Sequence, residues 1–89
     1  MTMNSVLTHC SSQLGELTAS YEWCLSRPIR EAAACRRDLA VISEKARYLN
    51  QRLTDLFMED ESECDMAALL NTANDAARLS IRASHVLAA

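Results

Sequence analysis

The chain has 89 residues, 49% of them hydrophobic, and its formal net charge is -3 at pH 7. This length predicts one domain with a small core, covering residues 1–89. The negative charge disfavours nonspecific nucleic-acid binding, which depends on an excess of basic residues. One glycine and one proline leave few positions for turns, so the composition predicts a few long helices.

The first predicted helix covers about residues 4–27. Steps of three and four residues, typical of a helix packed along one face, separate the apolar residues Met3, Leu7, Cys10, Leu14, Leu17, Tyr21 and Cys24. Gly15 and several serines and threonines lie between them, so we expect this helix to depend on packing. Trp23 lies off the series. It is either a buried contact at the edge of the fold or an anchor for a partner, because tryptophan is enriched at the energetic centres of interfaces.

The second predicted helix covers residues 28–58 and has the most regular pattern. Its main apolar series is Ala32, Cys35, Leu39, Ile42, Ala46, Leu49, Leu53 and Leu56. A further apolar stripe of Ala34, Val41 and Tyr48 has heptad spacing on a different face. Two apolar faces predict either the central helix of three or the shared helix of an oligomer. At Pro28 the chain either turns back or continues as one long, kinked helix.

The third predicted helix covers about residues 64–87 and follows an acidic connection, residues 59–65. Ser62 and Asp65 in that connection fit a capping box. The predicted inner face consists of Met66, Leu69, Leu70, Ala73, Ala76, Ala77, Ser80, Ala83, Ser84 and Leu87. Its small residues would let another helix approach closely, and Arg78 and Arg82 lie on the opposite face.

Short connections between these helices predict an all-α fold, either an antiparallel three-helix bundle or an extended helical hairpin, with coiled-coil-like packing. The small core also predicts an oligomer. The antiparallel arrangement brings six arginines and one histidine to one end, namely Arg27, Arg30, Arg36, Arg37, Arg78, Arg82 and His85. The acidic connection lies at the other end. Either this separation satisfies the helix dipoles, or it forms a docking surface for an acidic partner or for head-to-tail assembly.

The sequence offers no catalytic or metal-binding constellation. The four cysteines include no C-x-x-C pair, and the two histidines lack companion ligands. We therefore predict no enzymatic activity, no cofactor and no metal. Cys24 and Cys35 share one end of the predicted fold, which leaves a redox role open.

The N-terminus and the apolar runs indicate location. The N-terminal residues lack the pattern of a secretory signal, and no apolar run approaches the about 20 residues of a membrane span. We therefore expect a cytoplasmic protein without membrane contact, whose cysteines are reduced thiols.

Two segments carry a resemblance to a known family. The first is Leu69-Leu70-Asn71-Thr72-Ala73-Asn74-Asp75-Ala76, and the second is Ala34-Cys35-Arg36-Arg37-Asp38-Leu39-Ala40. The first is similar to the last helix of small type III secretion chaperones, the helical co-chaperones that hold needle subunits soluble before export, and the second resembles the penultimate helix of that group. The resemblance covers about half the chain. It implies a cytoplasmic helical hairpin with a protein partner.

These observations predict a helical protein-interaction module: an adaptor, co-chaperone or assembly factor that binds partner helices or a second copy of itself. The candidate partner-binding residues are Trp23, Ala34, Val41, Tyr48, Arg36, Arg37, Arg78 and Arg82. One alternative is a small dimeric regulator that binds nucleic acid through the arginines. Another is a thiol or metal sensor.

Overall fold

The computed structural model describes residues 3–26, 32–58 and 66–88, which form three helices. They are α1 (Met3–Ser26), α2 (Ala32–Met58) and α3 (Met66–Ala88). The all-helical prediction is confirmed: the three helices pack against one another, and the described residues contain no strand. The predicted starts of the second helix at residue 28 and of the third helix at residue 64 lie outside the described residues.

Several sequence predictions concern residues outside the described part of the chain. The choice between a turn and a kink at Pro28 lies there. So do the acidic connection and the capping box of Ser62 and Asp65.

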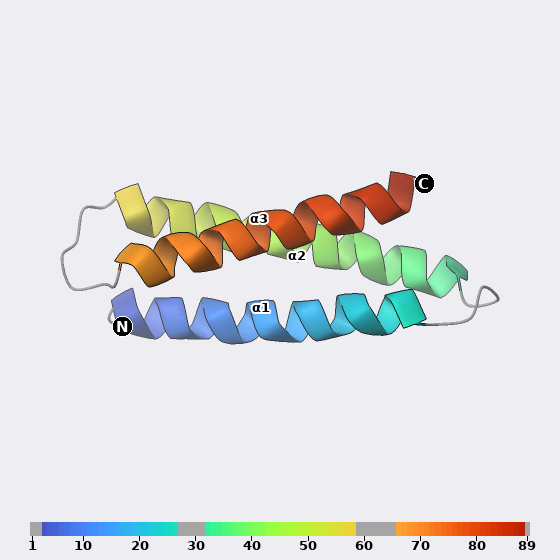
Figure 1. The fold of residues 1–89 in the computed structure, drawn as a ribbon, viewed down its shortest axis with the longest axis horizontal. Coiled ribbons are helices and arrows are strands. Elements are labelled where there is room, and N and C mark those ends of the chain that lie inside the picture. The colour runs from blue at the N-terminus through green and yellow to red at the C-terminus, as the bar shows by residue number, and fades with distance from the viewer. Residues whose placement is uncertain (1–2, 27–31, 59–65, 89) are drawn as a thin grey trace.

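The described helices lie side by side along a body measuring 49 × 19 × 18 Å. In Figure 1 the N-terminal ends of α1 and α3 lie at the same end of the molecule as the C-terminal end of α2. The most extensive packing is between α2 and α3, that between α1 and α2 is smaller, and α1 touches α3 least. The helix α2 therefore carries the contacts that hold the other two in place.

The core is built from one apolar seam of each helix. Its buried residues are Cys10, Leu14, Cys24, Cys35, Leu39, Ile42, Ala46, Leu49, Leu53, Leu69, Ala73, Ala76, Leu79 and Ala83. From Cys35 to Leu53 the main apolar series of α2 is buried throughout, so its steps of three and four identify the inner face correctly.

Two corrections concern α3. Leu70 was placed on the inner face, but 43% of its surface is exposed. Leu79 was not placed there, yet it is a core residue with 5% exposure. The buried positions of α3 run Leu69, Ala73, Ala76, Leu79 and Ala83, again in steps of three and four. Leu70 follows Leu69 directly and is therefore rotated by about 100° away from the core.

Polar contacts between α2 and α3 accompany this apolar seam. The hydroxyl oxygens of Ser43 and Ser84 are 2.8 Å apart, and Ser80 Oγ donates to the Ser43 carbonyl at 3.1 Å. Further along, Asn50 Nδ2 donates to the Ala73 carbonyl at 2.9 Å. Because each bond joins a particular pair of positions, these contacts fix how far the two helices slide past each other.

Candidate functional site

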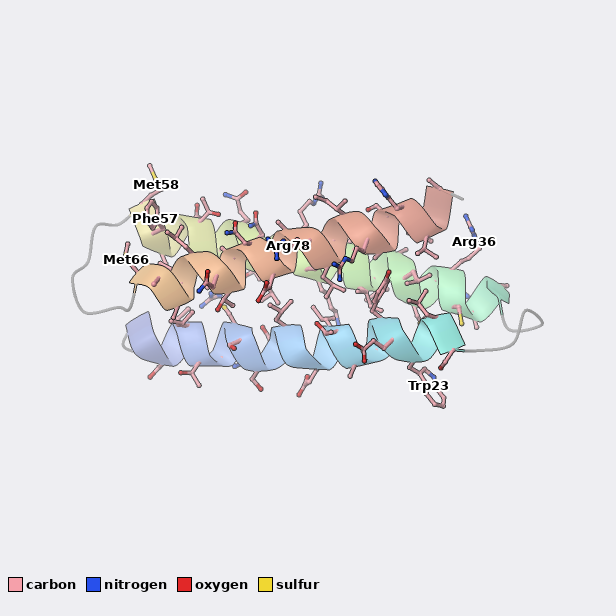
Figure 2. All side chains as sticks on the ribbon, viewed as in Figure 1. Trp23, Arg36, Phe57, Met58, Met66 and Arg78 are labelled. Atoms are coloured by element: carbon pink, nitrogen blue, oxygen red, sulfur yellow. The ribbon has the colours of Figure 1, made fainter. Side chains whose placement is uncertain are left out.

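The surface carries several large apolar side chains that the core does not use. Three of them, Trp23, Val41 and Tyr48, are 60%, 50% and 60% exposed. The interpretation of Trp23 as a buried edge contact is therefore wrong. Figure 2 shows it projecting from the outer side of α1, away from α3.

These three side chains border the α1–α2 groove, which consists of two adjoining hollows on the outer side of the two helices. The first, of about 310 Å³, is lined by Leu17, Ser20, Trp23, Cys24, Asp38, Val41, Ile42 and Lys45. The second, of about 260 Å³, is lined by Gln13, Glu16, Leu17, Lys45, Tyr48 and Leu49. Leu17 and Lys45 belong to both hollows, so the two form one continuous groove between the helices.

The groove exists because α2 has a second seam beside the one that enters the core. Five residues in steps of three and four form this outward seam: Asp38, Val41, Lys45, Tyr48 and Arg52. All five are exposed. From α1, Leu17 forms the floor and is half-buried, packed against the core. A helix with two such seams can pack on partners along both.

The charged side chains of the groove are not tied up by ion pairs within the described residues. The ion pairs found there lie elsewhere, between Glu44 and Arg47 at 3.5 Å and between Asp75 and Arg78 at 3.9 Å. Neither Asp38 nor Lys45 forms an ion pair with another residue of the described helices. At the end of the seam, Arg52 Nη1 donates to the Tyr48 hydroxyl at 3.5 Å. The groove therefore offers apolar surface with charges available at its rim.

The remaining predicted site residues fall in other places. Ala34 is half-buried near the start of α2, and Arg37 is exposed. Arg36 Nη2 donates to the Leu87 carbonyl at 2.6 Å, which ties the start of α2 to the end of α3. Arg78 lies near the middle of the molecule in Figure 2, well away from Arg36. The arginines therefore do not form a single patch.

Arg78 and Arg82 border a second groove, of about 480 Å³, between α1 and α3. Its acidic lining residues are Glu22 and Asp75. Its floor includes Leu14, Gly15 and Leu79. This groove follows from the slight packing of α1 against α3, and its rim carries two acids and two bases.

The cysteines of the described segments are free thiols, and Cys10, Cys24 and Cys35 are buried. Burial raises the pKa of the Cys10 thiol, and nearby Arg52 opposes this shift. Cys35 Sγ lies 3.6 Å from the Cys24 carbonyl oxygen, so the structure does bring these two residues together. Residues 3–26, 32–58 and 66–88 contain no group of three or more His, Cys, Asp or Glu side chains that could hold a metal ion.

Two further findings bound the class of protein. None of the described helices is both long and apolar enough to cross a membrane. The fold and the groove define a small all-α protein of three helices with an exposed apolar groove between two of them. Searches of protein families, of curated proteins and of solved structures find no match for this chain.

Sequence reasoning named Trp23, Val41 and Tyr48 but did not see that they share one groove. It also missed Leu17, Asp38 and Lys45. The signal for Asp38 and Lys45 was present, because both continue the heptad spacing of Val41 and Tyr48. Because both residues are charged, the apolar pattern of the sequence does not include them.

Proposed function

We propose that this chain is a non-enzymatic protein-interaction module whose α1–α2 groove binds an amphipathic helix. The observation that carries the proposal is the gathering of Trp23, Val41 and Tyr48 along one groove, all at least half exposed. An amphipathic helix laid along such a groove inserts side chains at intervals of three and four residues. It would add a further helix to the three already present.

The energetic reason is the burial of apolar surface. Removing apolar surface from water contributes about 25 cal/mol per Å². A tryptophan or tyrosine buries about 150–250 Å² when it is enclosed. Trp23 lines one hollow of the groove and Tyr48 lines the other, so a docked helix would cover both of them together with Val41. Asp38 and Lys45 would then select the orientation of that helix by pairing with charges on it.

The role that suits this surface is that of an adaptor, co-chaperone or assembly factor acting in the cytoplasm. Each of these holds another helical protein without altering it chemically. The resemblance of the second and third helices to type III secretion co-chaperones supports the co-chaperone form. In that form, the bound helix would belong to an exported subunit.

Site-specific photo-cross-linking tests the proposal. Val41 or Tyr48 is replaced by benzoyl-phenylalanine in the full chain, which is irradiated in its native cell, and adducts are mapped by mass spectrometry. We expect adducts on helical segments, because both positions border the groove. Ile81, an apolar residue of α3 with 55% exposure that lines neither hollow of the groove, is the matched control position. Equal yields from positions 41, 48 and 81 would overturn the proposal.

A further inference from the structure

The charges along the outward seam of α2 are complementary to those of an identical seam that runs in the opposite direction. We infer that the α1–α2 groove receives the α2 helix of a second copy of this chain, in an antiparallel pair related by a twofold axis near Lys45. The inference rests on the proposed function and names the partner. Asp38 and Arg52 lie seven residues to either side of Lys45. Reversal about Lys45 therefore places Asp38 opposite the partner's Arg52, and Arg52 opposite the partner's Asp38.

The apolar residues obey the same reversal. Val41 lies four residues before Lys45, and Tyr48 lies three residues after it. In the antiparallel pair, Val41 lies within one residue of the partner's Tyr48, and the same contact repeats on the other side of the axis. Each end of the seam thus forms one ion pair and one apolar contact with the second copy. A twofold interface requires this property, because one patch must be complementary to itself.

The axis brings the two Lys45 side chains near each other, and the groove contains the compensating charge. Glu16 of α1 lines the same hollow as Lys45. The pair would therefore hold two lysines and two glutamates around the axis. Asp38, Lys45, Arg52 and Glu16 together carry two negative and two positive charges. A neutral face does not repel a second copy, although the whole chain carries a charge of -3.

The size of the face also suits a dimer. A standard protein interface buries about 800 Å² on each partner. The described part of the molecule is 49 Å long and 19 Å wide, so one long side offers an area of that order. The exposed surface of Trp23 and Tyr48 supplies the large aromatic contacts that dominate the energetics of such interfaces.

Sedimentation velocity of the purified full chain, up to about 0.5 mM, tests the inference. We expect a monomer–dimer equilibrium. Asp38→Arg places two arginines opposite each other and Arg52→Asp places two aspartates opposite each other, so each is expected to raise the dimer dissociation constant at least about tenfold. The double variant restores both ion pairs and should return to within about threefold of the wild type. Glu22→Arg, which reverses an exposed acid of α1 that lines neither hollow of the groove, is the matched control and should leave the constant unchanged.

Val41→Glu gives a second measurement that does not depend on charge pairing. It should abolish the dimer, whereas Ile81→Glu should not; circular dichroism verifies that both variants keep the helical content of the wild type. A wild type that is monomeric throughout, or a double charge reversal that fails to restore the dimer, would overturn the inference. A monomeric wild type that still cross-links through positions 41 and 48 to a different protein would overturn the second-copy partner and support the proposed function. A monomer with no such cross-link would overturn both.

Discussion

The α2–α3 pair and the α1 helix are held in different ways. The α2–α3 pair combines a continuous apolar seam with hydrogen bonds from Arg36, Ser43 and Asn50. The helix α1 contacts mainly α2 and touches α3 little. Its sequence contains glycine and many serines and threonines, which form helices poorly. The α2–α3 pair is thus held by extensive packing and hydrogen bonds, whereas α1 depends on its packing against α2. Both sides of α1 therefore remain open as grooves.

The largest expected effect on stability comes from truncating a buried side chain between α2 and α3. Leu53 is fully buried, at 0% exposure. Leu53→Ala should lower the free energy of unfolding by about 3–5 kcal/mol, because it removes transfer energy and leaves a cavity. A domain of this size has only about 5–13 kcal/mol in total. Urea unfolding followed by circular dichroism measures the change. The protein concentration is held fixed because self-association would contribute to stability.

Leu17→Ala is the matched change in α1. Leu17 is half-buried against the core, so its truncation should cost about 1 kcal/mol. Equal losses for Leu17 and Leu53 would contradict the difference between the two regions.

The sequence predicts the hairpin better than it predicts the site. Cys35, Leu39, Ile42 and Leu53 lie on one helical face, and their spacing alone identified the buried side of α2. The groove could be identified only from the structure, because no spacing within one helix tells which residues of α1 lie beside Val41 and Tyr48. The misplacement of Leu70 has a similar origin: Leu69 and Leu70 lie about 100° apart around the helix, and only the packing selects Leu69 as the buried residue.

A polar contact gives the second prediction. Asn50 is half-buried and donates to the Ala73 carbonyl. Asn50→Ala leaves that bond unmade and should cost about 1 kcal/mol. The same measurement on Gln51→Ala serves as the control, because the Gln51 bond to Asp55 is exposed and lies within α2. An Asn50→Ala loss no larger than that of the control would show that the bond between the helices does not contribute.

The third prediction uses the buried thiol of α1. Burial raises the pKa of Cys10 above its ordinary value of 9.0. The folded state then holds this proton to higher pH than the unfolded state, so the contribution of the neutral thiol is complete below pH 9.0 and is lost as the pH rises through the folded pKa. As the pH rises above 9.0, the urea midpoint of the wild type should therefore fall more steeply than that of Cys10→Ala. Parallel curves would show that the burial of Cys10 does not act on stability in this way.

The smallest expected effect is a gain, and it tests why α1 is the weaker element. A Cβ atom added at Gly15 would meet no atom within 4 Å outside its immediate helix surroundings, so alanine fits there without strain. Gly15→Ala should raise the free energy of unfolding by about 0.5–1 kcal/mol, because alanine loses less backbone entropy than glycine in a helix. The melting temperature, measured at fixed concentration, should rise by several degrees, about 4–8 °C per kcal/mol for a domain of this length. If the melting temperature fell, Gly15 would have a close neighbour in solution that the described helices do not supply. Gly15 lines the α1–α3 groove, so that neighbour would lie in the second groove and not against the outward seam of α2. A rise in the melting temperature would therefore show that glycine weakens α1 and that the α1–α3 groove is empty at this position. A fall would show that another chain packs there.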